Sequence, residues 1–271
     1  MNKELAQKYG ELKKAINKLD NAIVAFSGGV DSALVLKAAY DALGNNVVAV
    51  TADSPSLPRR ELEEAKNIAE KTGAKHLVIG TKETENQNYI KNPSNRCYYC
   101  KSELYSKLRA VAEELGIKNI LNGTNFDDLS DYRPGLKAAE EFNIISPLKD
   151  ARLTKKEVRE LAKYLGLEIW DKPSSPCLSS RIPYGSEVTL KKLAMIEESE
   201  NFIKDLGIKE LRVRNFGDAA RIEINEKDKH TINDNFELIQ KKCREIGFNK
   251  IIISDFRSGS LSVSINVRAE N

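Results

Sequence analysis

The stretch that decides the fold is residues 21–36, which read Asn-Ala-Ile-Val-Ala-Phe-Ser-Gly-Gly-Val-Asp-Ser-Ala-Leu-Val-Leu. Residues 22–26 form an apolar run with Ile and Val, which favours a buried strand of a parallel sheet. Gly28 and Gly29 follow this run, and from Val30 onward apolar residues recur at helical spacing. The stretch therefore predicts a strand, a tight turn and a helix in immediate succession.

The predicted turn has the composition of an anion-binding site. Backbone N–H groups of a glycine turn can point at a phosphate, and the N-terminus of the following helix adds positive dipole. Gly28 and Gly29 let the backbone approach the phosphate without an intervening Cβ. Ser27 and Ser32 can donate hydroxyl groups, and Asp31 could hold a magnesium ion at the phosphates.

The hexapeptide Ser-Gly-Gly-Val-Asp-Ser at 27–32 is more specific than an ordinary strand–helix turn. It resembles the PP-loop of the ATP pyrophosphatases, which adenylate a substrate and release pyrophosphate. It is not a Walker A loop, because no Lys follows the second glycine, and it lacks the three spaced glycines of the dinucleotide fingerprint. The resemblance implies ATP contacts from Ala25, Phe26, Ser27, Gly28, Gly29, Asp31 and Ser32, with a catalytic role for Asp31.

The composition of the 271-residue chain is that of a soluble globular protein, with 31% charged and 41% hydrophobic residues. A net charge of +3 without a dense basic block does not indicate a nucleic-acid binder. The sequence has no apolar run long enough to span a membrane, and its charged N-terminus does not resemble a secretory signal. We therefore expect a cytoplasmic protein, in which the four cysteines would not form structural disulfides.

Strand and helix patterns alternate through the first two thirds of the chain, which predicts a doubly wound parallel α/β sheet. Thr154 followed by Glu157 predicts a capping box at the start of a helix. Thr51 follows the second predicted strand, at the sheet edge where ligands of open α/β sheets bind, and is an expected adenosine contact. The predicted helices are 5–19, 59–71, 105–115 and 154–165, and the further strands are 47–50, 76–79 and 119–121.

The pattern changes after Pro183. Helices are predicted at 189–206 and 231–246, and strands at 210–215, 220–224 and 250–254. This order predicts a small α+β domain. We therefore divide the chain into a PP-loop ATP pyrophosphatase domain at 1–183 and a substrate-binding and oligomerisation domain at 184–271.

Three of the four cysteines fall in predicted loops. Cys97 and Cys100 form a CxxC pair in a loop with Pro, Asn and Ser, just before a predicted helix. Cys177 follows Pro176 in a second loop, whereas Cys243 lies within a predicted amphipathic helix and is expected to be a small core residue.

The cysteine spacing alone leaves several chemistries open. A CxxC pair can be half of a zinc site, a redox pair or part of a cluster site. A zinc site lacks obvious further ligands, because His76 lies on a predicted strand and His230 in the second domain. Three thiolates fit an iron–sulfur cluster that has one iron without a protein ligand.

Four strings, at 27–32, 123–128, 131–135 and 171–185, together resemble the LarE family, ATP-dependent sulfur transferases that make the nickel-pincer nucleotide cofactor. The most specific of them contains Lys-Pro-Ser-Ser-Pro-Cys at 172–177. The resemblance implies that ATP adenylates a carboxylate of pyridinium-3,5-biscarboxylic acid mononucleotide and that sulfur then displaces AMP. It also implies ATP or magnesium contacts from Gly123 and Asp128, although Asp127 and Asp128 could instead cap a helix.

Members of this family differ in their sulfur donor. The single-cysteine type has only the counterpart of Cys177 and sacrifices its sulfur. This sequence adds Cys97 and Cys100 and resembles the three-cysteine type, which is similar to cluster-dependent tRNA thiolation enzymes. The resemblance implies that Cys97, Cys100 and Cys177 hold a 4Fe–4S cluster that carries an extra sulfide, with Cys177 at the reaction centre.

An anion site is expected in the second domain. Arg212 and Arg214 alternate on a predicted strand and so share one face, although a solvated strand face would look the same. Paired guanidinium groups suit a phosphate, and the resemblance extends this predicted substrate-phosphate site to Arg181 and Glu223.

Three other functions fit parts of the pattern: thiolation of tRNA, amide transfer as in NAD or GMP synthetases, and nucleotide-dependent regulation with structural zinc. The sulfur-transferase prediction implies ATP, Mg²⁺ and a 4Fe–4S cluster as cofactors. It also implies a small nucleotide substrate, a sulfide source and a homo-oligomer, with neither membrane nor nucleic acid as partner.

Overall fold

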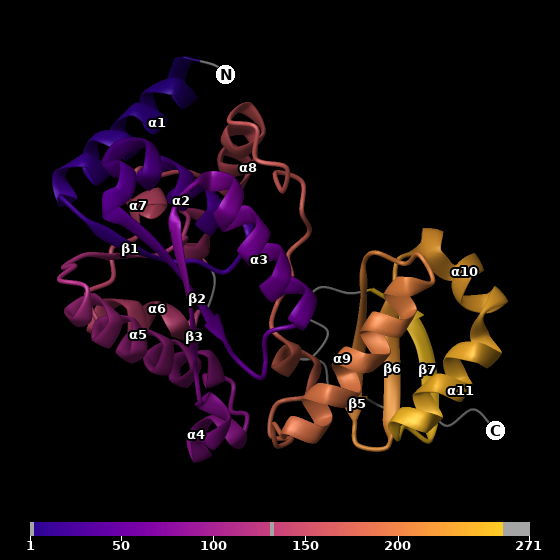
Figure 1. The fold of residues 1–271 in the computed structure, drawn as a ribbon. Helices are drawn as coiled ribbons and strands as arrows, with labels where there is room; N and C mark the ends of the chain where they lie inside the picture. The colour runs from indigo at the N-terminus through magenta and orange to yellow at the C-terminus, as the bar shows by residue number, and fades with distance from the viewer. Residues whose placement is uncertain (1–2, 131–132, 257–271) are drawn as a thin grey trace. The chain divides into compact units, whose positions relative to one another are not determined.

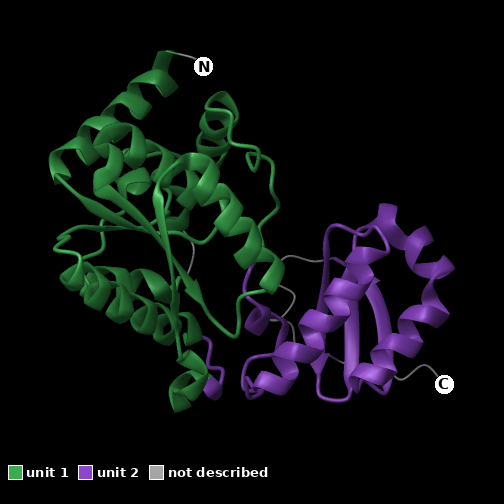
Figure 2. Ribbon diagram, in the orientation of Figure 1, with its two compact units in different colours: residues 1–89, 95–175 green, residues 90–94, 176–271 purple. Residues whose placement is uncertain are grey.

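The computed structural model describes residues 3–130 and 133–256, so Asp131 and Tyr132 of the motif at 131–135 lie outside the described residues. The chain divides into two compact units (Figure 2). Unit 1 comprises Met1–Tyr89 and Asn95–Ser175, and unit 2 comprises Ile90–Ser94 and Pro176–Asn271. Among the described residues, no helix is both long enough and apolar enough to cross a membrane.

Unit 1 is built on a parallel sheet with the strand order β3-β2-β1-β4 (Figure 1). A single parallel bridge between Leu121 and Ile145 extends the sheet beyond β4. The strands are β1 (Ala22–Ala25), β2 (Val47–Asp53), β3 (Lys75–Gly80) and β4 (Ile120–Leu121).

Helices cover both faces of this sheet, which confirms the predicted α/β class (Figure 1). Neighbouring strand residues point to opposite faces, so Val24 packs with the first helix layer and Ile23 with the second. The first layer contains α1 (Lys3–Ile16), α2 (Val30–Leu43), α3 (Arg59–Thr72) and α8 (Lys155–Tyr164). The second layer contains α5 (Arg96–Glu114) and α6 (Pro134–Glu141).

Short helical segments complete unit 1. They are η1 (Asn17–Leu19), η2 (Gly44–Asn46), η3 (Glu83–Glu85), α4 (Gln87–Ile90), η4 (Asp127–Ser130) and α7 (Pro147–Asp150). Ile90, the last residue of α4, is however assigned to unit 2. The chain runs outward from β1 to β2 and β3, then returns to place β4 on the other side of β1. The carboxyl ends of β1 and β4 therefore flank a topological switch point, where open α/β sheets bind their ligands.

Unit 2 has a three-stranded mixed sheet with the order β5-β6-β7. Strands β5 (Leu211–Phe216) and β6 (Ala219–Ile224) are antiparallel, and β7 (Lys250–Asp255) is parallel to β6. The helical segments are η5 (Leu178–Arg181), α9 (Leu190–Asp205), η6 (Glu226–Asp228), α10 (Lys229–Asp234) and α11 (Phe236–Ile246). Cys243 lies in the core of this unit as predicted, and burial raises the pKa of its thiol.

Two helix predictions are wrong. The CxxC pair does not lie in a loop, because α5 begins at Arg96 rather than near Tyr105. The Tyr98 hydroxyl donates to Glu141 of α6 (2.7 Å), and this tertiary contact supports the early turn. The predicted helix at 231–246 is two helices, and at the break Asn235 Nδ2 donates to the carbonyl of Thr231 (2.8 Å).

Candidate active site

The glycine turn after β1 requires its glycines for steric reasons. Gly28 has a φ of +72°, which residues with a Cβ rarely adopt, and a Cβ there would lie 2.9 Å from the Cβ of Ala65 in α3. Gly123, which follows β4, approaches the start of α2 so closely that a Cβ would lie 2.7 Å from the backbone nitrogen of Ser32. The ends of β1 and β4 therefore meet through backbone contacts.

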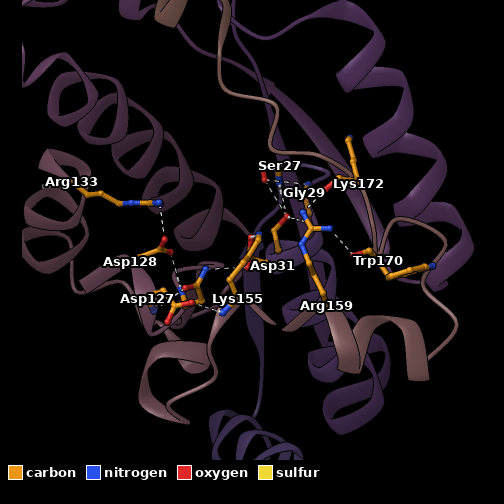
Figure 3. A network of polar contacts seen from close by, with 12 residues as sticks. Ser27, Gly29, Asp31, Asp127, Asp128, Arg133, Lys155, Arg159, Trp170 and Lys172 are labelled. Carbon is orange, nitrogen blue, oxygen red and sulfur yellow. Dashed lines mark hydrogen bonds and ion pairs between the residues drawn. The ribbon is translucent and has the colours of Figure 1, made fainter. Parts of the chain in front are cut away.

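Hydroxyl groups inside the loop hold its shape (Figure 3). Ser32 Oγ donates to the carbonyl of Gly29 (3.0 Å) and accepts the Ser27 backbone N–H (3.2 Å). The two serine oxygens lie 3.1 Å apart, and the Gly29 N–H points to Ser27 Oγ at 3.4 Å. This folded loop leads directly into α2, whose N-terminus attracts an anion.

Asp31 connects this loop to the segment after β4 and to α8 (Figure 3). Its Oδ1 accepts from Asn125 Nδ2 (3.1 Å), and its Oδ2 pairs with the Lys155 ammonium group. The Asn125 side chain is itself oriented, because its Oδ1 accepts the Asp127 N–H at 3.0 Å. The backbone N–H of Lys155 donates to Asp127 Oδ2 (2.9 Å), so these residues form a closed network.

Asp128 stabilises the same segment. Its Oδ2 accepts the backbone N–H of Asn125 (3.0 Å), and its Oδ1 lies 2.8 Å from Arg133. The short 3₁₀ segment η4 starts at Asp127, so both predicted roles, an active-site position and a helix-terminal one, are compatible with this geometry.

The residues at Asp31 fit a magnesium ion that is bound together with a nucleotide. Mg²⁺ usually takes one or two carboxylates and completes its coordination with phosphates and water. Asp31 supplies such a carboxylate, and the Lys155 ammonium shows that a cation is accommodated there. Among residues 3–130 and 133–256, no group of three or more His, Cys, Asp and Glu side chains has a metal-binding arrangement.

Thr51 lies within β2 and not in a loop after the strand, so its predicted position is wrong, and its side chain is buried. Its Oγ1 donates to the carbonyl of Phe26 (2.9 Å) and lies 2.8 Å from Nε2 of His76. Burial, with a smaller contribution from Lys66, lowers the pKa of His76. The Thr51 hydroxyl thus supports the strand end, and Thr51 remains a predicted adenosine contact.

A buried carboxylate that the sequence did not reveal fixes the next part of the loop. Glu83 accepts from Ser56 Oγ (3.1 Å) and is also bonded to Ser54 Oγ. Arg59 donates to the carbonyls of Ser54 (2.6 Å) and Leu57 (2.8 Å). The bonds of Glu83 have no local sequence signal, because Glu83 is 27 and 29 positions away from the two serines along the chain.

Lys172 joins the string at 172–177 to the glycine turn (Figure 3). Its ammonium group lies 3.4 Å from the carbonyl of Gly28 and binds Glu61 (2.7 Å) and Glu64 (2.8 Å) of α3. Arg159 of α8 donates to the Lys172 carbonyl (2.7 Å). The segment 172–177, which resembles the LarE family, therefore begins at the predicted phosphate site. The sequence alone did not predict the contact of Lys172 with the glycine turn.

The three cysteines predicted as cluster ligands belong to different units. Cys97 and Cys100 lie at the start of α5 in unit 1, and their spacing of three residues places them on the same side of the helix. Cys177 lies in unit 2 and precedes η5. The described part of the chain contains no disulfide, and neither unit by itself contains all three residues.

In unit 2, two of the predicted phosphate-binding arginines form buried ion pairs. Arg181, whose side chain is 4% exposed, binds Glu200 through Nε (2.9 Å) and Nη2 (3.1 Å). Arg214, at 3%, binds Glu223 through Nε (3.0 Å) and Nη2 (2.8 Å). The Glu223 carboxylate also pairs with Arg221 at 3.1 Å.

Arg212 differs from both. Its guanidinium lies 4.6 Å from the ring centroid of Phe256, and within the described ranges no carboxylate lies at ion-pair distance. Burial, followed by the nearby charges of Arg181 and Arg214, lowers the pKa of Arg212. The three arginines therefore lie close together, and we call them the arginine group. Its Arg212 member has no ion-pair partner among the described residues, so its guanidinium suits a phosphate.

Comparison with known proteins agrees with this fold. Residues 21–168 match the family model described as the argininosuccinate synthase N-terminal HUP domain, so unit 1 is a domain of the PP-loop class. A pyridinium-3,5-bisthiocarboxylic acid mononucleotide synthase from Lactiplantibacillus plantarum is 39% identical over 95% of each chain. The chain belongs to the same family, the LarE family of ATP-dependent sulfur transferases.

Two further relatives are similar to the chain to different extents. An uncharacterized protein from Synechocystis is 43% identical over 97% of this chain and 94% of its own. One of the subunits of a glutamine-hydrolyzing GMP synthase from Halobacterium salinarum is 26% identical over 72% of this chain and 67% of its own. The similarity to the GMP synthase is weaker and covers less of the chain.

Proposed function

We propose that this protein uses ATP to activate a carboxylate of pyridinium-3,5-biscarboxylic acid mononucleotide and then replaces an oxygen of that carboxylate by sulfur. The observation that carries the proposal is the 39% identity, over 95% of each chain, to the Lactiplantibacillus plantarum synthase. The glycine turn, Asp31 and the arginine group of unit 2 supply groups suited to two different phosphates.

In the first step, a substrate carboxylate oxygen attacks the α-phosphorus of ATP, and the bond to the bridging oxygen of the β-phosphate breaks. Pyrophosphate leaves and an acyl-adenylate forms. The N–H groups of the turn and the N-terminus of α2 stabilise negative charge on the departing pyrophosphate. A magnesium ion held at Asp31 would neutralise further charge on the phosphates.

In the second step, a sulfur nucleophile attacks the acyl carbon, and AMP leaves as a thiocarboxylate forms. Arg212 would bind the substrate phosphate. The pairs Arg181–Glu200 and Arg214–Glu223 support Arg212 by fixing the charges around it. Glu223 would then contribute by orienting Arg214 rather than by contacting the anion.

We propose that Cys97, Cys100 and Cys177 supply the sulfur. The first five residues of α5 carry the first two of these thiols, which lie on the same side of the helix. A 4Fe–4S cluster on the three thiolates would leave one iron open to carry an extra sulfide delivered by a separate source. If no cluster forms, Cys177 is left as a sacrificial sulfur donor.

The cluster is tested by measuring iron, acid-labile sulfide and zinc in protein reconstituted without oxygen. We expect about four irons per chain, and loss of iron when Cys97, Cys100 or Cys177 is replaced by Ala. Cys243→Ala is the control that should retain iron, because this residue lies in the core of unit 2. Zinc, or full iron content in a Cys97→Ala protein, would contradict the cluster.

The activity is tested by pyrophosphate release. The account predicts release that depends on ATP and on the pyridinium mononucleotide. Bulk tRNA should not support release, and ammonia should not replace sulfide in forming product. Release that depends on tRNA alone would instead assign the protein to tRNA thiolation.

A further inference from the structure

We propose that Lys155 binds the terminal phosphates of ATP and the pyrophosphate that leaves, and that without nucleotide its ammonium occupies the cation position at Asp31. This inference rests on the ATP-binding part of the proposed function. It adds a phosphate ligand that lies outside the glycine turn and outside the four segments that resemble the LarE family.

Lys155 is positioned by contacts on both sides of its backbone. Thr154 and Glu157 form the capping box that starts α8, and Lys8 of α1 binds Glu157 at 2.6 Å. The Lys155 N–H is bonded to Asp127 Oδ2 (2.9 Å). The backbone is therefore fixed, and Figure 3 shows Lys155 beside Asp31. The four-carbon side chain of a lysine is flexible and can change its direction.

The two partners of Asp31 differ in how easily they can be displaced. Asn125 is 3% exposed and is held by Asp127 and Asp128, so removing it would leave buried polar groups without partners. The side chain of Lys155 is 37% exposed, and ion pairs of this kind contribute little net stability. A magnesium ion arriving at Asp31 would therefore displace Lys155 and not Asn125.

The displaced ammonium would remain beside the phosphates that share the metal. Lysine acts on phosphate as a mobile point charge and, unlike arginine, needs no fixed planar geometry. Lys155 would thus neutralise Asp31 before nucleotide binds and the phosphates afterwards. The positive charge of Lys155 is therefore paired with a negative group both without and with bound nucleotide.

The first test is calorimetric titration of the full-length protein with inorganic pyrophosphate in the presence of MgCl₂, and separately with AMP. Lys155→Met should weaken pyrophosphate binding by about tenfold or more, since a bond to a charged group is lost. AMP affinity should be unchanged, because AMP lacks the terminal phosphates, and this also shows that the variant is folded. Lys156→Met is the matched control, because Lys156 is the exposed neighbour on the same helical turn.

Wild-type pyrophosphate affinity in Lys155→Met would overturn the inference and leave the proposed function intact. Failure of the wild-type protein to bind Mg-ATP would instead contradict the ATP-binding part of the proposed function.

The second test measures Mn²⁺ binding to the nucleotide-free protein by electron paramagnetic resonance. Lys155→Met should bind Mn²⁺ about fivefold more tightly, because a competing positive charge at Asp31 is gone. Adding Asp31→Asn should remove this gain. Unchanged or weaker Mn²⁺ binding in Lys155→Met would contradict the exchange of cations.

Discussion

The ion pairs at the candidate sites of the two units differ in how far they are buried. At the glycine turn of unit 1, the side chains of Lys155 and Asp31 are 37% and 22% exposed. In unit 2, those of Arg214 and Glu223 are 3% and 1% exposed. Exposed pairs contribute little stability and exchange partners readily, whereas breaking a buried pair leaves an uncompensated charge. We infer that unit 1 exchanges its cations during the reaction, while unit 2 keeps its charges fixed around one recognition group.

Removing the carboxylate from a buried ion pair of unit 2 should have the largest effect on stability. Glu223→Ala leaves Arg214 buried without its carboxylate and should reduce the free energy of unfolding by about 3–5 kcal/mol. Urea denaturation measures this change. Glu198→Ala, which removes the exposed partner of Lys242, should change stability by less than about 1 kcal/mol. Equal effects of the two substitutions would show that burial does not distinguish the pairs.

Gly123→Ala tests the backbone contact on which the exchangeable site depends. The new Cβ would lie 2.7 Å from the Ser32 nitrogen, and backbone cannot move aside as a flexible side chain can. We expect destabilisation by about 1–3 kcal/mol together with weaker ATP binding. In Gly10→Ala, the added Cβ would meet nothing within 4 Å, so ATP affinity should be retained. Normal ATP binding in Gly123→Ala would contradict the close approach of the two strand ends.

Arg212→Ala tests whether Arg212 contributes to substrate binding and not to stability. It should weaken binding of the pyridinium mononucleotide by roughly 1.5–3 kcal/mol, the range for a hydrogen bond to a charged group. Stability should change little, because Arg212 stacks on Phe256 outside the buried pairs. Binding is measured by calorimetry, with Arg244→Ala on α11 as a charge-matched control. A loss of stability without a loss of affinity would assign Arg212 a purely structural role.

The smallest expected effect is the dependence of the free energy of unfolding on pH. The fold lowers the pKa of His76 below its value of about 6.5 in the unfolded chain, so the unfolded state binds more protons as the pH falls through that value. Stability should therefore be lower at about pH 5.5 than at about pH 7.5. His76→Gln should reduce this dependence, because it removes the histidine that is buried in the folded state. An unchanged pH dependence in His76→Gln would locate the cause elsewhere.

The sequence predicted features that local chemistry determines. The apolar run, the tight turn at Gly28 and Gly29 and the Thr154 capping box each act within a few residues, and the structure confirms all three. The CxxC pair was wrongly placed in a loop because Pro93, Ser94 and Asn95 precede it, and its helical turn is supported by a contact with α6.

Other site features depend on contacts between distant parts of the chain. Lys155 meets Asp31 across 124 positions, and Lys172 meets Gly28 across 144. No periodicity or spacing in the sequence encodes such pairs, because they arise only when the strands assemble. The cytoplasmic location and the homo-oligomer remain predictions from the sequence.

The most direct test of the central claim is to incubate the reconstituted protein with ATP, Mg²⁺, sulfide and pyridinium-3,5-biscarboxylic acid mononucleotide without oxygen, and to measure the masses of product and protein together. The account predicts a nucleotide in which sulfur has replaced oxygen, formed over several turnovers by a protein of unchanged mass. A product limited to one turnover, with loss of sulfur from the chain at Cys177, would contradict the cluster-bound sulfur source. Absence of any sulfur-containing product, with pyrophosphate release also absent, would contradict the claim of ATP-dependent sulfur transfer to this substrate.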